Sequence, residues 1–177
     1  MFTYRVDKEI NLIFLQHSMA DSLYELVDAN REYLKEWMPW VANTNSPDDI
    51  KAFIERSING FSKNESLVCG IEYQETLVGI ISFNKISKEL KKVVLGYWIA
   101  EQMQGRGIIT RCCNSLIEYA FDEMEMQKVE IRSASDNTKS RSVCDRLGFT
   151  LEGVVSNSEN INGRIVDHAV YGIHKET

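Results

Sequence analysis

The chain has 177 residues, of which 44% are hydrophobic and 26% charged, as expected for one globular domain covering residues 1–177. The formal net charge of −6 argues against direct nucleic-acid binding, which depends on clustered Lys and Arg side chains. The N-terminal residues lack the apolar core of a signal peptide, and the longest apolar run, residues 93–100, is too short to span a membrane. These features predict a cytoplasmic protein that does not enter a membrane.

Hydrophobic periodicity and turn residues divide the first hundred residues into strands and helices. The predicted elements are a strand over 10–15, a helix from 18 to about 31, a helix from 46 to near 60, and strands over 66–73, 76–86 and 92–100. The second helix begins at Ser46-Pro47, an N-cap serine followed by proline at the first helical position. Pro39 should end any preceding helix near Trp37 or Met38, because the residue before a proline avoids helical backbone.

The rest of the chain alternates helices and strands before a closing hairpin. The predicted elements are a helix from about 107 to 124, a strand over 128–133, a helix over 137–146, and a hairpin of strands 150–157 and 164–174 with Asn162-Gly163 at its tip. Only the segment from 92 to 133 demands a parallel strand pair, because a helix joins its two strands. The sequence therefore predicts a mixed α+β fold, with a mostly antiparallel central sheet, one parallel strand pair and flanking helices.

The four cysteines contain no C-x-x-C pair, and the three histidines show no metal-ligand spacing. We therefore expect neither a metal site nor a disulfide framework. His17, His168 and His174 are interpreted as ordinary surface or strand residues.

Gln104-Gly105-Arg106-Gly107 lies between a predicted strand and a predicted helix. A helix N-terminus has unpaired amides, glycines let the backbone approach a ligand, and an arginine can pair with a pyrophosphate. The same glycines would also serve a plain strand-to-helix turn, so this element alone leaves both interpretations open. The P-loop and dinucleotide-binding motifs are absent from the sequence.

In this context, Gln104-x-x-Gly107 resembles the acetyl-CoA signature Q/R-x-x-G-x-G/A of the GCN5-related N-acetyltransferases. The segment NTKSRSVCDRLGFTLEG, residues 137–153, resembles the N-x-x-S…LGF…EG segment of the same superfamily. More narrowly, LKEWMPWV (34–41), GYWIAEQMQGRGI (96–108) and NSENINGRIVDHAVYGI (157–173) together resemble the ribosomal-protein alanine and serine N-acetyltransferases. One position departs from the signature: Ile109 replaces Gly or Ala, so its side chain must turn into the sheet interface while its amide stays available.

The resemblance implies acetyl-CoA as the acetyl donor and assigns its binding to particular residues. In the glycine element, the expected cofactor contacts are Gln104, Gly105, Arg106, Gly107, Ile108 and Ile109. The backbone amide near Ile99 is expected to meet the oxyanion, on a strand that members of this superfamily splay away from its neighbour. Asn137 resembles the residue that hydrogen-bonds the pantetheine arm, although asparagine is also a common helix N-cap.

Two residues are candidates for proton transfer. Glu159 stands where the resembling family carries its glutamate base, although alone it would be interpreted as a solvated turn residue, and Glu152 is a rival base. A modest carboxylate base suffices for an α-amine, whose pKa is about 8, compared with about 10.4 for lysine. Ser140 is the candidate for hydrogen-bonding or protonating the coenzyme A sulfur, although it would also serve as a local helix cap.

The acceptor amine is expected opposite the cofactor, against an apolar wall formed by Tyr33, Trp37, Met38 and Trp40. A spacing of four residues would place Tyr33 and Trp37 on one helical face. These aromatics would serve equally well as core or as a homodimer contact. Three functions stay open: acetylation of the N-terminal amine of a ribosomal or other protein, acetylation of a small amine (a polyamine, amino acid or aminoglycoside), and noncatalytic acyl-CoA binding.

Overall fold

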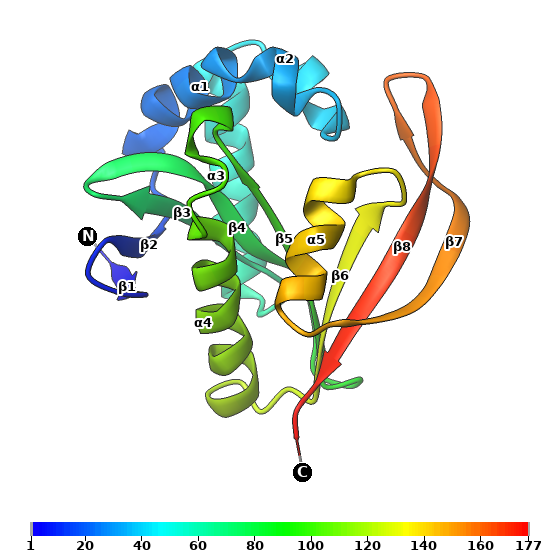
Figure 1. Cartoon of the computed structure of the whole chain (residues 1–177). Coiled ribbons are helices and arrows are strands. Elements are labelled where there is room, and N and C mark those ends of the chain that lie inside the picture. Colours follow the sequence, from blue (N-terminus) through cyan, green and yellow to red (C-terminus); the bar gives the residue numbers. More distant parts are fainter. Residues whose placement is uncertain (1, 177) are drawn as a thin grey trace.

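In a computed structural model that describes residues 2–176, eight strands form one sheet in the order β1-β2-β3-β4-β5-β6-β8-β7 (Figure 1). The strands are β1 Thr3–Arg5, β2 Ile10–Phe14, β3 Leu67–Tyr73, β4 Thr76–Ser87, β5 Lys92–Ile99, β6 Lys128–Ala134, β7 Thr150–Ile161 and β8 Arg164–His174. All neighbouring strands in it are antiparallel except β5 and β6. The predicted fold class, a mixed sheet with one parallel pair, is confirmed.

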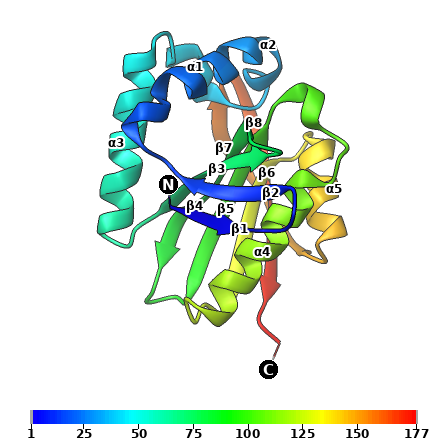
Figure 2. The same ribbon diagram turned by 90° about the vertical axis from the view of Figure 1, so that its left-hand side faces the viewer.

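Helices cover both faces of the sheet (Figure 2). They are α1 Ala20–Ala29, α2 Arg31–Leu34, α3 Pro47–Ser62, α4 Ile108–Asp122 and α5 Thr138–Arg146, with short 3₁₀ segments η1 His17–Met19, η2 Pro39–Asn43 and η3 Glu101–Met103. One apolar core lies under α1 and α3, and a second, larger core lies under α4 and α5. No helix within residues 2–176 is long and apolar enough to cross a membrane.

The start of α3 confirms its sequence signal. The Ser46 side chain accepts a hydrogen bond from the Asp49 amide, and the Asp49 carboxylate accepts one from the Ser46 amide at 2.9 Å. This capping box pairs two amides that the helix itself leaves unsatisfied, and Pro47 fits the first helical position because it has no amide hydrogen.

The parallel pair β5–β6 opens into a fork. Its pairing runs from Lys92 with Lys128 to Leu95 with Ile131, although β5 continues to Ile99 and β6 to Ala134. In Figure 1 the two strands lie together near their starts and part toward their ends. The fork, residues 96–99 of β5 and 132–134 of β6, is the splayed arrangement that the family resemblance implied.

Two predicted elements need correction, and one strand was missed. The single helix expected from 18 to about 31 is divided: α1 ends before the buried Asn30, whose side-chain amide donates to the Leu26 carbonyl and whose side-chain oxygen accepts from the Glu101 amide, both at 2.9 Å. The short strand β1 was not predicted. The first hairpin strand continues to Ile161, four residues beyond its predicted end, so Glu159 lies within a strand rather than in a turn.

Candidate active site

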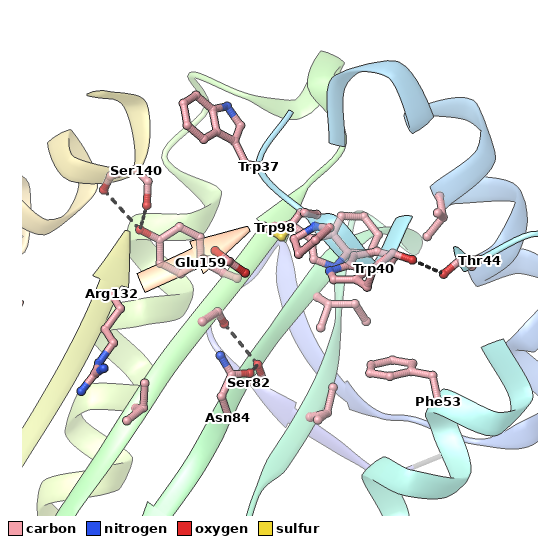
Figure 3. Close-up of a pocket in the computed structure, with 18 of the residues that line it drawn as sticks. Trp37, Trp40, Thr44, Phe53, Ser82, Asn84, Trp98, Arg132, Ser140 and Glu159 are labelled. Carbon is pink, nitrogen blue, oxygen red and sulfur yellow. Dashed lines mark hydrogen bonds between the residues drawn. The ribbon is translucent and has the colours of Figure 1, made fainter. Parts of the chain in front are cut away.

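A cavity of about 860 Å³ lies at the fork and is lined from both faces of the sheet (Figure 3). Leu95 and Tyr97 belong to the core side of α4 and α5, whereas Trp98 and Phe53 belong to the side of α1 and α3. The cavity therefore reaches both layers of the protein through the gap between β5 and β6. Six residues of the predicted site line it: Trp37, Met38, Trp40, Asn137, Ser140 and Glu159.

The glycine element turns from β5 into α4 with left-handed backbone at two positions. Gly105 has φ 72° and Gly107 has φ 69°, a region that disfavours residues with a Cβ atom. Gly107 is the N-cap of α4, and no side chain of the described residues caps it, so the first amides of the helix stay open to a ligand. Arg106 is exposed beside them. This arrangement fits a pyrophosphate group.

The two isoleucines after Gly107 take different positions. Ile108 is buried, and Ile109 is half-buried and packs against the core of α4 and α5. The Ile109 side chain thus turns inward, as its departure from the family signature required, and leaves its backbone at the helix start.

Gln104 links the glycine element to two other segments. Its side-chain oxygen accepts a hydrogen bond from Lys139 of α5 at 3.2 Å, and its side-chain amide contacts the Tyr33 hydroxyl of α2. Tyr33 was predicted to share a helical face with Trp37 in the acceptor wall. The expected helical face is not formed, because α2 ends at Leu34, and Tyr33 is not among the residues that line the cavity.

The edge of β5 at the fork carries backbone donors. The Ala100 amide donates to the Val78 carbonyl of β4 at 2.8 Å. Because amides alternate in direction along a strand, those of Ile99 and Tyr97 point away from β4, toward the gap. The Ile99 amide thus lies where the sequence analysis expected an oxyanion contact.

Glycines let β4 and β5 approach closely at this point. A Cβ atom on Gly79 would lie 2.3 Å from the Trp98 carbonyl oxygen, and one on Gly96 would lie 2.3 Å from the side-chain amide of Asn84. Asn84 is the extra residue of a bulge between β4 and β5, so the irregularity falls on β4 and not on the strand that borders the gap. Its side-chain oxygen accepts from the Ser82 hydroxyl at 2.7 Å, and both side chains line the cavity (Figure 3).

Ser140 and Asn137 come from the start of α5. The Asn137 side chain accepts the Ser140 amide at 3.1 Å and so caps the helix, while both residues also line the cavity. The Ser140 hydroxyl lies 3.3 Å from the hydroxyl of Tyr97 on β5. Burial raises the pKa of Tyr97 well above its ordinary value, so this phenol stays protonated. Two neutral hydroxyls therefore stand together on one side of the fork.

Glu159 reaches the cavity because β7 is irregular. Between the pairs Val155–His168 and Glu159–Val166, β7 has three residues where β8 has only Asp167. Asn157 adopts φ 50° there, and its amide donates to the Asp167 carboxylate at 2.9 Å. The side chain of Glu159 is 35% exposed, and its carboxylate lies 3.0 Å from Nε2 of His168. The rival Glu152 instead pairs with Lys128 and His174, outside the cavity.

The aromatic residues form two groups at the wall of the cavity opposite Ser140 (Figure 3). Trp40 and Trp98 have ring centroids 6.0 Å apart at an angle of 45°. Trp37 packs against Ile161 and Val166 of the closing hairpin, and the Arg164 guanidinium lies 5.0 Å from its ring centre. This contact holds the hairpin against the segment after α2. The wall therefore unites segments that are far apart in the sequence.

Several cavity residues escaped the sequence analysis. Tyr97 and Trp98 line the cavity from the predicted strand over 92–100, and Phe53 lines it from the predicted helix from 46 to near 60, but none of them was assigned to the site. His168 does lie in a strand, as predicted, but its side chain lines the cavity and contacts Glu159. The sequence did indicate the direction of the Tyr97 side chain. Side chains alternate along a strand, so Tyr97 and Trp98 must point to opposite faces of the sheet. The contact of His168 with Glu159 depends on the β7 irregularity, which brings Glu159 opposite Val166 and which the sequence does not show.

The comparison with known families agrees with this geometry. A family model described as "Acetyltransferase (GNAT) domain" matches residues 10–150, so the chain belongs to the GNAT acetyltransferase family. The protein is accordingly an N-acetyltransferase, and its acetyl donor is acetyl-CoA. The open amides of the glycine element and the divided strands of the fork fit that donor.

Individual relatives cover nearly the whole chain. YdaF of Bacillus subtilis (strain 168), which carries the provisional name of a ribosomal N-acetyltransferase, is 34% identical over 99% of this chain and 96% of its own. The ribosomal-protein-serine acetyltransferase of Escherichia coli (strain K12) is 28% identical over 96% and 94%. The crystal structure of the microcin C7 self-immunity acetyltransferase MccE with acetyl-CoA and AMP has a TM-score of 0.93 and 34% identity over 96% and 94%.

Proposed function

We propose that this protein transfers the acetyl group of acetyl-CoA to the N-terminal α-amine of a ribosomal or other protein. The observation that carries the proposal is the cavity at the fork, which has Glu159 and Ser140 on its walls and is lined by residues from both faces of the sheet. Two full-length relatives named for ribosomal-protein acetylation support the class of acceptor.

The chemistry of the amine favours an α-amine over a lysine. Deprotonation at neutral pH costs roughly 1 kcal/mol for an α-amine with a pKa near 8 and roughly 4 to 5 kcal/mol for lysine. The proposed base is one carboxylate, Glu159, which is 35% exposed and lies 3.0 Å from the imidazole of His168. It suits the smaller of these two demands.

Four groups of the protein divide the work. The Trp40–Trp98 wall holds the residues next to the amine, and Glu159 accepts the proton that the ammonium must lose, directly or through one water. The Ile99 amide donates to the acetyl carbonyl oxygen as negative charge develops there. The Ser140 hydroxyl donates a hydrogen bond to the departing coenzyme A sulfur. The new N–C bond replaces the S–C bond. Of the two protons that the ammonium nitrogen loses, Glu159 takes the first and releases it to solvent, and the second leaves with the coenzyme A sulfur as the free thiol.

A smaller acceptor is the second candidate. The two tilted tryptophan rings at the cavity offer flat surfaces, and MccE, at 34% identity, was crystallised with AMP. An amine attached to a nucleobase-bearing group would use the same base and the same donor site. The two candidates differ in the group that packs against Trp40 and Trp98: peptide residues in the first and a nucleobase in the second. Noncatalytic acyl-CoA binding is not supported, because Glu159 and Ser140 both face the cavity.

The test is free-thiol release from acetyl-CoA over a panel of acceptors. The panel contains peptides that begin with Ser or Ala, the same peptides with a blocked N-terminus, spermidine, and a nonhydrolysable aminoacyl adenosine. The proposal expects turnover with the free peptides and none with the blocked ones. Turnover with spermidine or the adenosine compound alone would overturn the peptide assignment.

A further inference from the structure

The Glu159 carboxylate has one protein partner in the described structure, the imidazole of His168. The two side chains meet at 3.0 Å, between Oε2 and Nε2, and both line the cavity. His168 lies in β8, where it pairs with Val155 of β7 and Ala134 of β6. Its side chain is 18% exposed, half the exposure of the Glu159 side chain. The histidine is thus the better-fixed member of the pair.

The β7 irregularity creates this contact. In a regular antiparallel ladder with Val155 opposite His168, residue 157 would stand opposite Val166. The two additional residues put Glu159 there instead, on the same face of the sheet as His168. The hydrogen bond from the Asn157 amide to Asp167 fixes the irregular segment at its midpoint. The backbone is therefore shaped to present this carboxylate to this ring.

The contact constrains the chemistry of both groups. A carboxylate only accepts hydrogen bonds, so a neutral His168 must carry its proton on Nε2 to be its partner. One carboxylate oxygen is then engaged, and Oε1 has no hydrogen-bond partner among the described residues. Without this contact, the glutamate side chain would rotate about its free bonds, since it is otherwise more than one-third exposed.

We propose that His168 is a positioning residue for the acyl transfer: its Nε2–H holds the Glu159 carboxylate so that the other oxygen takes the proton of the acceptor amine. The inference rests on the proposed function, because it assigns a partner to the proposed base. The proton passes from the amine nitrogen to Oε1 of Glu159, and His168 keeps its own proton throughout. His168 acts through Glu159 and does not touch the acetyl group.

The chain supplies a matched control. His174 lies on the same strand β8 and contacts Glu152 of β7 at 3.5 Å, so it forms a second histidine–glutamate pair between the same two strands. The His174 side chain is 66% exposed, and neither residue lines the cavity. Removal of the His174 imidazole therefore measures the general cost of losing such a pair.

The kinetic experiment is a double-mutant cycle with a peptide that the wild-type enzyme acetylates. His168→Leu should lower kcat about tenfold in the wild-type background and leave kcat unchanged in Glu159→Gln. The KM for acetyl-CoA should stay the same in all four proteins. His168→Gln, which can place an amide donor near the Nε2 position, should recover most of the rate, and His174→Leu should behave as wild type.

Several results would overturn the proposal. His168→Leu could lower kcat by the same factor with and without Glu159, which would mean that it acts on the fold rather than on the base. A rate for His168→Leu equal to that of His174→Leu would also remove it. So would a His168→Gln protein that folds normally and is no faster than His168→Leu.

A readout without an acceptor separates this inference from the proposed function. Nitrogen-15 NMR of the labelled imidazoles should show His168 as the Nε2–H tautomer, and this signal should change in Glu159→Ala while that of His174 does not. The pairing would be contradicted if His168 were the Nδ1–H tautomer and its nitrogen-15 signal did not change in Glu159→Ala. If the wild type acetylates no peptide but shows the pairing, the acceptor assignment alone fails, and the cycle is then run with whichever small amine is turned over.

Discussion

The two halves of the active site are built in different ways. The proposed donor half centres on one contiguous segment, residues 104–109, which presents open backbone amides at the start of α4. The acceptor half takes side chains from the segment after α2, from α3, β5, β7 and β8, and depends on the contact between Trp37 and the closing hairpin. A site made of backbone amides can be predicted from a short stretch of sequence. A site made of side chains from several elements depends on how distant segments pack together.

Loss of the proposed base should have the largest effect. Glu159→Gln should lower kcat by about a hundredfold or more, because a neutral amide cannot take a proton from the amine. The remaining rate should rise with pH as the α-amine, with a pKa near 8, deprotonates by itself. Affinity for acetyl-CoA, measured by calorimetry, should not change, because the effect is confined to the acceptor half. Glu152→Gln is the control, and a rate for Glu159→Gln equal to its rate would remove Glu159 as base.

The second prediction concerns the strands that hold the two halves together. Glu130 of β6 lies opposite Val94 of β5, just before the fork, and its side chain is 3% exposed. Burial alone would raise the pKa of Glu130, but hydrogen bonds from Lys92 at 2.9 Å and Arg132 at 2.7 Å outweigh it and lower that pKa below its ordinary value. Glu130→Gln should therefore reduce the free energy of unfolding at pH 7 by about 2 kcal/mol.

The sign of its pH dependence follows from the lowered pKa. The stabilisation is present above the unfolded-state pKa of Glu130 and is lost as the pH falls through the lower folded-state value. Urea unfolding of the two proteins should thus converge in acid. A difference in unfolding free energy that stayed constant down to the acid range would contradict this account of the ion pairs.

The third prediction tests the donor half alone. Arg106→Met should weaken acetyl-CoA binding about tenfold, and the difference should shrink with added salt, because the arginine is exposed. Arg111 in the first turns of α4 is the control, since it pairs with Asp7 at 2.8 Å and Glu9 at 3.0 Å instead. Arg111→Met should lower stability and leave the affinity unchanged. Equal losses of affinity in the two variants would show that Arg106 does not contact the cofactor.

The smallest effect is expected at the leaving group. A thiol with a pKa near 8.5 leaves readily, and the Tyr97 hydroxyl lies 3.3 Å from that of Ser140. Ser140→Ala should lower the single-turnover rate only about fivefold, and Ser140→Ala combined with Tyr97→Phe should lower it further. A full rate in the double variant would show that neither hydroxyl serves the sulfur.

The fold was predictable where local sequence decides the backbone. The Ser46-Pro47 helix start, the Asn162-Gly163 hairpin tip and the glycine element each place their backbone groups within a few residues. The single parallel pair was predicted because a helix connects its two strands, and such a crossover joins parallel strands. The glycine element, together with the segment 137–153, also led to the correct family.

The rest depended on contacts between distant residues. α1 ends early because Asn30 bonds to the Glu101 amide, 71 residues further along the chain. The β7 irregularity needs Asn157 in a left-handed conformation and a bond to Asp167 across the hairpin. Hydrophobic periodicity does not indicate either of these contacts. The first hairpin strand was therefore predicted too short, and the contact of Glu159 with His168 was not predicted.

The most direct test is the position of the transferred acetyl group. A peptide with a free N-terminal serine and one internal lysine is incubated with labelled acetyl-CoA and the enzyme, and the product is sequenced by tandem mass spectrometry. We predict label on the α-nitrogen only, with the amount falling about a hundredfold in Glu159→Gln. Label on the lysine, or equal label with wild type and Glu159→Gln, would contradict N-terminal transfer by this base.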